Sequence, residues 1–359
     1  MKRILHLYKE FYPVSGGIQQ AIKSVVELTP EYEHTILTTS SELDGTESLY
    51  GAKVIYCKKL AEIMSTPITF KYISTARKLI KEHDIVCAHY PYPMNELVLL
   101  GLKPKKLIYF WHSDIVSQKI AKHAVYPFVR MALKKADKVF ISYPEMATNS
   151  DVLNAFADKT VVSSYYVDTT QTEASTDDVK AKYGRYMLGI GRLVPYKGFD
   201  YMIRAMKDIG DMNLVIVGSG PVQEELDGLI TELGLQERVF IVNGVTDDQL
   251  KIFCKGCEFF VFPSCLPSEA FGIATLEAMV YGKAVLNTWL HTGVNYVARD
   301  GEEAVTVEAK SASALASGAN RLGLDVELRD NLGYNAKLRV ESFFTKEKRR
   351  SALLSEFGD

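Results

Sequence analysis

The sequence predicts an α/β protein with two doubly wound parallel sheets, and three observations carry this prediction. Short apolar runs alternate with amphipathic stretches along the chain, which is typical of a parallel sheet covered by helices on both faces. A polar segment of short side chains, 168–178, interrupts the alternation as a linker would. The alternation then starts again, and 359 residues suffice for two domains of ordinary size.

The elements follow in order from these runs. Apolar runs predict first-half strands at 3–8, 34–39, 52–57, 84–88, 106–111 and 137–142. Amphipathic stretches predict helices between most of them, among them 17–28, 68–82 and 118–135. Beyond the linker, strands are predicted near 186–190, 213–217, 238–242, 258–262 and 284–287, and a last helix at 345–357.

Two glutamates, Glu269 and Glu277, are separated by seven residues. We expect Glu269 to end a loop and Glu277 to lie about two turns into the next helix. Phe271, Gly272 and Ile273 then form the helix N-terminus, where free N–H groups and the helix dipole favour a phosphate. A carboxylate on each side could hold a diol, which suits a nucleotide-activated sugar. The alternative for Glu277 is a solvated helix residue.

Other motifs follow predicted strands. Arg192 and Lys197 come after the strand at 186–190, where cations would stabilise the charge that grows on a leaving diphosphate. Their alternative is a surface pair on a loop. Glycine turns follow the strand at 213–217, with Gly218, and the first strand, with Gly16 and Gly17.

These motifs, in this order, resemble retaining glycosyltransferases of family 4, which have the GT-B fold. The resemblance spans nearly the whole chain. It implies two Rossmann-like doubly wound domains that face a cleft: an acceptor-side domain at 1–167, on which the helix 345–359 packs back, and a nucleotide-sugar domain at 168–344. It also implies hexose transfer with retention and no metal cofactor, and no Asp-x-Asp occurs in the sequence.

The resemblance assigns site residues one by one. His112 follows the strand at 107–110 and is similar to the family's active-site histidine, which meets the donor sugar; the alternative is a structural histidine. Asp114 would orient His112 or cap the next helix, and His89 is a weaker candidate of the same kind. The catalytic residues implied are His112, Glu269, Arg192 and Lys197. The donor-binding residues implied are Gly16, Gly17, Gly191, Gly218, Val245, Phe271, Gly272, Ile273 and Glu277.

Two departures from the family pattern bear on the substrate. Ala270 stands where the family usually has glycine, and the segment 287–297 replaces a glycine-rich turn followed by a glutamate. That segment looks like a bacterial subgroup of mannosyl- and rhamnosyltransferases of surface polysaccharides. We therefore expect GDP-mannose as donor and a lipid-linked oligosaccharide of lipopolysaccharide or O-antigen as acceptor. A UDP-hexose and dTDP-rhamnose are the alternative donors.

Charge is distributed unevenly. Residues 1–165 carry 21 Lys and Arg against 16 Asp and Glu, while the remainder carries 21 against 28. The stretch 101–138 holds nine of the basic residues, interrupted by aromatic ones, and either contacts an anionic membrane surface or is a solvated helix face. No nucleic-acid motif accompanies it. The N-terminus resembles no signal peptide, so we expect a cytoplasmic protein that can be peripheral on the inner membrane.

Three other function classes compete. A GT-B sugar-nucleotide epimerase should lack the paired Arg192/Lys197 loop and Glu-x7-Glu element. A nicotinamide dehydrogenase needs Gly-x-Gly-x-x-Gly, and the segment after Gly189 and Gly191 lacks the third glycine. A non-catalytic binding protein would lose the charged residues. Cys254 and Cys257 have metal spacing without a second pair nearby, so we expect structural thiols.

Overall fold

A computed structural model describes residues 1–14, 16–63, 66–114 and 121–358. The chain divides into two compact units. Unit 1 comprises Met1–Tyr165 and Lys346–Asp359, and unit 2 comprises Tyr166–Thr345. The sequence placed these divisions at 167/168 and 344/345, two residues and one residue away.

Unit 1 contains an eight-stranded sheet in the order β10-β9-β8-β7-β1-β2-β4-β3. All neighbouring strands are parallel except β3, which runs antiparallel to β4 at the edge. The strands are β1 (Arg3–Glu10), β2 (Glu33–Ser40), β3 (Gly45–Leu49), β4 (Ala52–Lys58), β7 (Ile85–Tyr90), β8 (Leu107–Trp111), β9 (Lys138–Ile141) and β10 (Thr160–Val162). Two short strands, β5 (Ala61–Ile63) and β6 (Thr66–Ile68), pair separately.

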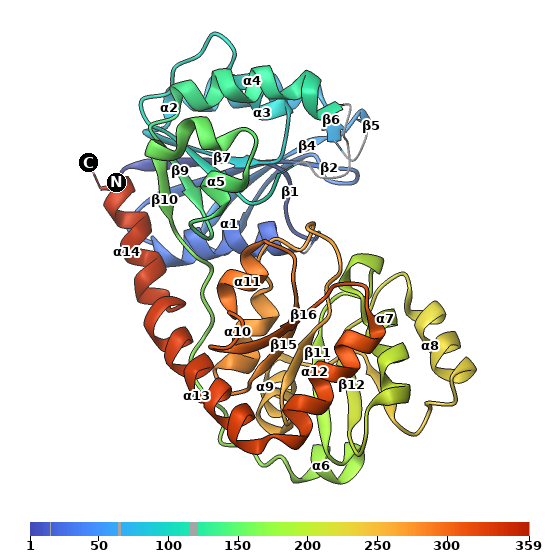
Figure 1. Cartoon of the computed structure of the whole chain (residues 1–359). Coiled ribbons are helices and arrows are strands. Elements are labelled where there is room, and N and C mark those ends of the chain that lie inside the picture. Colours follow the sequence, from blue (N-terminus) through green and yellow to red (C-terminus); the bar gives the residue numbers. More distant parts are fainter. Residues whose placement is uncertain (15, 64–65, 115–120, 359) are drawn as a thin grey trace. The chain divides into compact units, whose positions relative to one another are not determined.

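Helices cover both faces of the unit 1 sheet, as a fully buried strand such as β7 requires. Figure 1 shows α2, α3 and α4 on one face and α1 on the other, where α14 packs against α1. The α-helices are α1 (Gly17–Leu28), α2 (Phe70–Glu82), α3 (Met94–Leu99), α4 (Ala121–Lys135), α5 (Met146–Asn149) and α14 (Lys346–Phe357). A 3₁₀ segment spans Leu153–Lys159.

Unit 2 contains a six-stranded, all-parallel sheet in the order β13-β12-β11-β14-β15-β16. Counted along the chain this is the order 3-2-1-4-5-6 of a Rossmann fold, with the order reversing between β11 and β14. The strands are β11 (Tyr186–Ile190), β12 (Asn213–Val217), β13 (Val239–Val242), β14 (Phe260–Phe262), β15 (Val285–Thr288) and β16 (Ala304–Val307).

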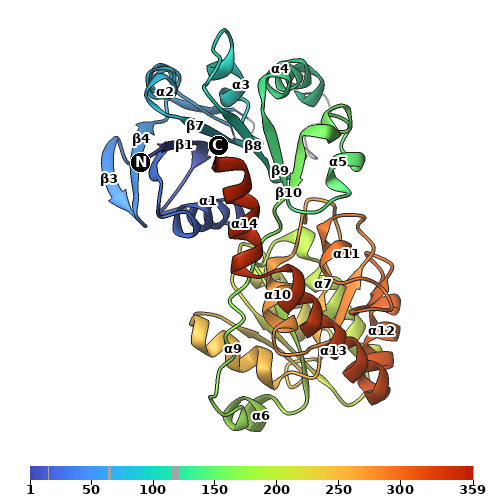
Figure 2. The ribbon, with the colours of Figure 1, turned by 90° about the vertical axis from the view of Figure 1, so that its left-hand side faces the viewer.

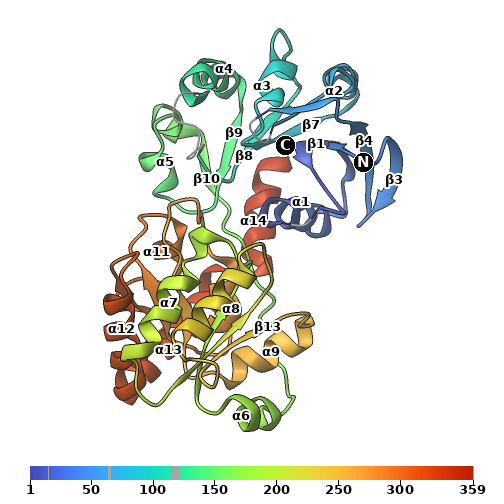
Figure 3. The same ribbon diagram turned by 90° about the vertical axis from the view of Figure 1, so that its right-hand side faces the viewer.

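The unit 2 sheet is also covered on both faces. Figure 2 shows α9, α10 and α13 on the side facing the viewer, and Figure 3 shows α7 and α8 on the opposite side. The α-helices are α6 (Asp177–Tyr183), α7 (Phe199–Ala205), α8 (Gln223–Glu232), α9 (Asp247–Gly256), α10 (Ile273–Met279), α11 (Gly293–Val297), α12 (Ala312–Leu324) and α13 (Val326–Phe343). Short 3₁₀ segments span Pro195–Lys197 and Met206–Asp208.

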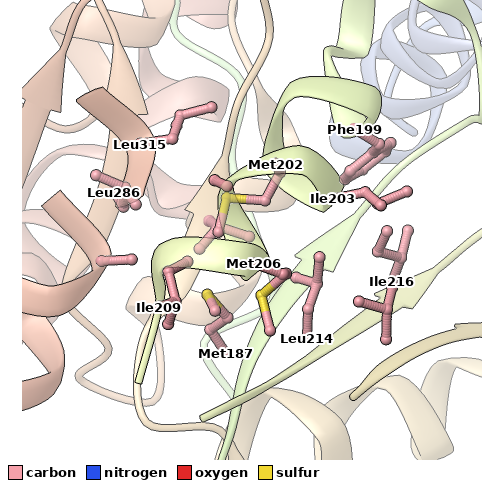
Figure 4. Packing of buried hydrophobic residues seen from close by; sticks show 14 of the residues in the cluster. Met187, Phe199, Met202, Ile203, Met206, Ile209, Leu214, Ile216, Leu286 and Leu315 are labelled. Atoms are coloured by element: carbon pink, nitrogen blue, oxygen red, sulfur yellow. The ribbon is translucent and has the colours of Figure 1, made fainter. Parts of the chain in front are cut away.

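The core of unit 2 lies between the sheet and α7, α8 and α12. Met187, Leu214 and Leu286 point from three strands into this core, where they meet Met202 of α7 and Leu315 of α12 (Figure 4). This packing fixes the strands on which the candidate site stands.

Candidate active site

Three loops meet at the carboxyl ends of the strands of unit 2, where an open α/β sheet binds its ligands. They follow β11, β12 and β14. The first loop is tied to the second by a bond from Leu193 N–H to the Ser219 carbonyl at 2.9 Å. It is tied to the third by a bond from Cys265 N–H to the Tyr196 carbonyl at 2.8 Å. The backbone therefore gathers motifs that lie some seventy residues apart in the sequence around the reversal point between β11 and β14.

Two glycines allow these loops to approach so closely. A Cβ atom on Gly218 would lie 2.0 Å from the Gly191 carbonyl oxygen, which no side chain could tolerate. Gly198 has the left-handed φ of 68°, and a Cβ atom there would lie 2.2 Å from the Pro263 carbonyl oxygen. Both positions therefore require glycine, because of close approach and because Gly218, with a φ of 155°, also has a backbone conformation that side chains rarely adopt.

Lys197 and Glu269 form an ion pair at this meeting point. Lys197 Nζ lies 2.6 Å from Glu269 Oε2, and the two side chains are only 12% and 11% exposed. The Ser264 hydroxyl donates to the same carboxylate oxygen at 3.2 Å. The Lys197 ammonium also lies 4.7 Å from the centre of the Phe262 ring, within cation–π range. The pair is thus held from several sides before any ligand binds.

Lys197 and Glu269 both have hydrogen-bonding groups left over for a ligand. Within the described part of the chain, Glu269 Oε1 has no hydrogen-bond partner, and its carboxylate can accept from a ligand hydroxyl. An ammonium has three donors, so Lys197 can bind an anion besides Glu269. Arg192 is exposed and has no ion-pair partner among the described residues. Hydroxyl recognition and anion binding are therefore available side by side.

Glu277 lies nearer to the helix start than the sequence predicted. The α10 helix begins at Ile273, so Glu277 is its fifth residue, about one turn in rather than two. The expectation failed because the preceding loop extends as far as Gly272. Burial raises the pKa of the half-buried Glu277 carboxyl to about 7, with a smaller contribution from the charge of Asp247.

The remaining donor-binding residues predicted in unit 2 follow its strands or begin its helices. Gly272 is the N-cap residue of α10, and the buried Phe271 precedes it. Val245 is half-buried in the segment between β13 and α9, directly before a capping box at Thr246. Gly191 is the first residue after β11.

The residues predicted in unit 1 lie at the carboxyl ends of its strands. Gly16 is the N-cap of α1 and Gly17 is its first residue, and both are exposed. His112 directly follows β8 and is 5% exposed. Burial, together with the charge of Arg349, lowers the pKa of His112 to about 3, so the imidazole is neutral.

The hydrogen bonds of His112 differ from the prediction that Asp114 orients it. The His112 Nε2 atom lies 3.0 Å from His89 Nδ1, and its Nδ1 atom lies 2.8 Å from the Tyr165 hydroxyl oxygen. Asp114 instead accepts from the Trp111 indole at 3.0 Å and from a serine hydroxyl. Both ring nitrogens of His112 are thus already engaged, so Asp114 does not orient this ring. A cap on α4 by Asp114 concerns residues 115–120, outside the described part.

Several contacts escaped the sequence reasoning. The sequence predicted a strand near 258–262, but not the contacts of Phe262 and Ser264 with the Lys197–Glu269 pair. The signal was available, because residues at the carboxyl end of a strand beside the reversal point face a ligand site. The contact of His112 with Tyr165 had no such signal, since Tyr165 follows a three-residue strand that was not predicted.

Other expectations concern metal and membrane. Among the described residues no group of three or more His, Cys, Asp and Glu side chains is placed to hold a metal ion. The thiols of Cys254 and Cys257 are buried and reduced. No helix in the described ranges combines the length and the apolar character that a membrane span needs. In the basic stretch, Lys119 and the side chain of Lys122 lie outside the described residues.

Comparison with known proteins identifies the family. The chain is 31% identical to the D-rhamnosyltransferase WbpZ of Pseudomonas aeruginosa over 356 residues, which cover 96% of this chain and 92% of that protein. It is therefore a group 1 glycosyltransferase. The family model described as glycosyl transferases group 1 matches residues 171–339, the part of the chain that carries the Lys197–Glu269 pair.

Further relatives of this group 1 glycosyltransferase agree. It is 29% identical to the O-antigen chain mannosyltransferase C of Escherichia coli, over 96% of this chain and 95% of that protein. Among solved structures, Anabaena HepE in complex with UDP matches with a TM-score of 0.81 and 18% identity, covering both chains completely. WaaG, a glycosyltransferase of lipopolysaccharide biosynthesis, matches with a TM-score of 0.73 and 17% identity over 99% of this chain and 100% of that chain. These likenesses confirm the GT-B fold with its two Rossmann-like domains.

Proposed function

We propose that this glycosyltransferase moves a hexose of the manno configuration from a GDP-linked donor to a hydroxyl of a lipid-linked oligosaccharide, with retention at the anomeric carbon. The observation that carries the proposal is the pair of relatives that match nearly the full chain, a D-rhamnosyltransferase and an O-antigen chain mannosyltransferase. D-rhamnose is 6-deoxymannose, so both names concern one ring configuration. A GDP-mannose-dependent mannosyltransferase of Mycolicibacterium smegmatis, 25% identical over 90% of this chain, also supports GDP as carrier.

In this proposal the ion pair at the sheet edge handles the sugar and its phosphate together. Glu269, whose Oε1 atom has no partner among the described residues, accepts from hydroxyls of the donor sugar. Lys197 holds Glu269 at 2.6 Å and turns a second N–H to the adjacent phosphate. Arg192, which is exposed, contacts the diphosphate from its solvent-facing side. Both cations act where negative charge grows as the donor bond breaks.

The opposite end of the donor is assigned to Glu277. A carboxylate there accepts from the two ribose hydroxyls, and backbone N–H groups near Phe271 and Gly272 hold the diphosphate between the two glutamates. Gly191, Gly218, Val245 and Ile273 line the same donor. His112, Gly16 and Gly17 keep their assignment to the donor as predictions.

The transfer proposed needs neither a metal nor a carboxylate nucleophile. The bond between the anomeric carbon and the phosphate oxygen breaks, and the acceptor oxygen bonds to the same face of the sugar. The acceptor hydroxyl proton passes to the leaving phosphate oxygen, so charge and protons balance. The protein contributes cations for the diphosphate and a carboxylate for the sugar, both preorganised.

The acceptor implies contact with a membrane. A Campylobacter jejuni relative, 31% identical over 50% of this chain, is named for transfer to a sugar on diphospho-undecaprenol. We extend that acceptor class to this chain. The α4 helix offers a surface for such a membrane, since it exposes Phe128 and Met131 as well as Lys134. This would make the enzyme peripheral on the cytoplasmic face of the inner membrane.

A donor screen tests the proposal. The full chain is incubated with GDP-mannose, GDP-D-rhamnose, UDP-glucose and dTDP-rhamnose, each with an undecaprenyl-diphosphate-linked acceptor. We expect transfer from a GDP-linked donor of manno configuration, in the absence and presence of chelator, and an α-linked product identified by NMR. Transfer from UDP-glucose or dTDP-rhamnose alone, or a product of inverted configuration, contradicts the proposal. Glu269→Gln is the matched control, and its transfer rate should be at least tenfold lower.

A further inference from the structure

A row of four histidines crosses the sheet of unit 1. His34 lies on β2, His6 on β1 and His89 on β7, and His112 directly follows β8. These four strands are neighbours in the sheet. The row continues beyond each end, to Thr29 at the end of α1 and to Tyr165.

Strand register explains why the rings line up. His34 pairs with Ile4, two residues before His6 on β1. His6 pairs with Cys87, two residues before His89 on β7. His89 pairs with Phe110, two residues before His112. Each step to the next strand therefore advances two residues, and a step of two keeps the side chain on the same face of the sheet.

The ring nitrogens are joined into one continuous series of hydrogen bonds. His34 Nδ1 lies 3.1 Å from His6 Nε2, and His6 Nδ1 lies 3.1 Å from His89 Nε2. His89 Nδ1 lies 3.0 Å from His112 Nε2. The rings are stacked, with centroids 5.3 to 5.4 Å apart between neighbours. We call these four residues the histidine row.

One end of the row decides the direction of every bond. His34 Nε2 lies 3.0 Å from the backbone carbonyl of Thr29, which can only accept, so this nitrogen carries a proton. The Thr29 hydroxyl, 3.1 Å from the same nitrogen, already donates to the Val25 carbonyl at 2.7 Å and therefore also accepts. In a neutral His34 the other nitrogen, Nδ1, then carries no proton, and its lone pair accepts a hydrogen bond from His6.

The direction of the hydrogen bonds stays the same along the row. His6 donates from Nε2 and accepts at Nδ1, His89 does the same, and so does His112, whose Nδ1 accepts from the Tyr165 hydroxyl. A second proton on His34, His6 or His89 would set two N–H groups against each other, because the Nδ1 atom of each faces the Nε2–H of the next ring. Burial lowers the pKa of each of the four imidazoles, so all four are neutral. The pKa of Tyr165 is raised to about 12, which keeps its hydroxyl a donor.

We propose that His34, His6 and His89 are positioning residues, which act together to hold His112 in its neutral Nε2–H tautomer and fix the direction of its ring. The carbonyl of Thr29, three rings away, sets that tautomer. A ligand hydroxyl that replaces Tyr165 at Nδ1 must then donate its proton to His112. This inference gives His112 a defined chemical state, and its value for catalysis rests on the donor-binding role proposed for His112 above.

Nitrogen-15 NMR of the full chain, labelled at histidine, tests the proposal directly. Long-range nitrogen–carbon-proton spectra distinguish a protonated Nε2 from a protonated Nδ1 on each ring. We expect His6, His34, His89 and His112 each as a single neutral Nε2–H tautomer. A His112 ring protonated at Nδ1, or at both nitrogens, at neutral pH overturns the proposal.

Two substitutions at the far end separate positioning from simple packing. His34→Leu removes the acceptor for His6 Nε2, so the row loses its fixed direction, and the single tautomer of His112 should be lost. His34→Gln keeps an N–H for the Thr29 carbonyl and an oxygen for His6, so His112 should stay as in the wild type. A folded His34→Leu variant whose His112 signal is unchanged also overturns the proposal. If that variant does not fold, the wild-type spectrum still decides.

These spectra are recorded without donor or acceptor, so they do not depend on the proposed transfer reaction. A chain that transfers no sugar but shows the four Nε2–H tautomers contradicts the proposed function and leaves the histidine row intact. Transfer activity with a mixed His112 tautomer contradicts the histidine row and leaves the function intact.

Discussion

Lys197 Nζ lies 2.6 Å from Glu269 Oε2, and both side chains are nearly buried although they come from different loops. Such a pair is more costly to break than a surface pair, because the partner left behind keeps a buried charge. Selection for stability alone would be met as well by two apolar residues of similar size. The proposed role of the pair in binding the donor therefore accounts for it better than stability does.

Lys197→Ala and Glu269→Gln should each lower the transfer rate at least tenfold, because a charge-assisted contact is worth about 1.5–3 kcal/mol. The double variant should lose less than the product of the two single losses, since both remove one interaction. Steady-state kinetics with the donor found in the screen measure this. Lys251→Ala is the control, because Lys251 lies 3.5 Å from Asp168 in the same unit but is 31% exposed, and its loss should change the rate less than about twofold. Wild-type rates in both single variants would rule the site out.

Arg192→Ala should weaken GDP binding without lowering the melting temperature, because Arg192 is exposed and has no ion-pair partner among the described residues. A contact with a diphosphate is also screened by salt, so the affinity difference between wild type and variant should shrink as ionic strength rises. Calorimetric titration with GDP at low and high salt measures both effects. An equal affinity at low salt would contradict the assignment of Arg192 to the diphosphate.

Glu277→Gln should stabilise unit 2 above pH 7 and change its stability little near pH 4. The folded-state pKa of Glu277 is raised from 4.5 to about 7, so between these values the folded chain holds a proton that the unfolded chain has lost. The wild-type free energy of unfolding therefore falls as pH rises through this window, by no more than about 3 kcal/mol. Glutamine cannot ionise, so the free energy of unfolding of the variant does not fall in this way.

Thermal unfolding of wild type and Glu277→Gln from pH 4 to pH 8 measures the difference. Asp247→Asn provides the control, because it removes a charge that helps to raise the pKa of Glu277. In this variant the free energy of unfolding should fall less between pH 4 and pH 8 than it does in the wild type. A difference between wild type and Glu277→Gln that does not depend on pH would show that the carboxyl titrates normally.

Gly218→Ala should destabilise unit 2 by at least about 1–3 kcal/mol, because the added Cβ atom meets the Gly191 carbonyl oxygen at 2.0 Å and because alanine rarely adopts the φ of 155° found at this position. Denaturant unfolding measures this. Gly228→Ala is the matched control, since Gly228 is exposed within α8 and an added Cβ atom there has nothing within 4 Å. That substitution should raise stability by about 0.5–1 kcal/mol. Equal effects at the two positions would refute the close approach.

Anionic liposomes should bind the full chain through α4. Phe128 and Met131 are 41% and 49% exposed and three residues apart, which places them on one face of the helix. Phe128→Ser with Met131→Ser should reduce liposome binding at all salt concentrations, and Lys134→Gln should reduce it at low salt, by about 1 kcal/mol. Flotation with anionic and neutral liposomes measures both.

The choice of variants follows from the basic stretch itself. Lys135 donates to the Leu99 and Leu102 carbonyls and so serves the fold, and Lys105 is already paired with Asp84 at 2.8 Å; both are left unchanged. Exposed apolar residues of α13, Tyr334 and Leu338, supply the control, and their replacement by serine should leave binding unchanged. Equal binding to neutral and anionic vesicles would exclude an electrostatic contact.

Local hydrophobic patterns were enough to predict the α/β class and most of the strands and helices from the sequence. The bounds of α1, β11 and β12 agree with the structure residue for residue. The sequence missed the short strands β3, β5, β6, β10 and β16. Of these, β3 and β5 are mostly exposed and lack the apolar run that marked equally short strands such as β11 and β14. It also determined which charged residues follow which strands, and so named Lys197 and Glu269 as members of one site.

The contacts between those residues could be seen only in the folded chain. Lys197 meets Glu269 because β11 and β14 are neighbours at the point where the strand order reverses, a fact of topology that no local pattern contains. Glu277 is buried enough to titrate near pH 7 because other elements pack around α10. The histidine row exists because four strands align with a regular offset of two residues. Register between strands depends on the whole sheet. The sequence therefore did not predict that His6 and His34 are linked to His112 through His89.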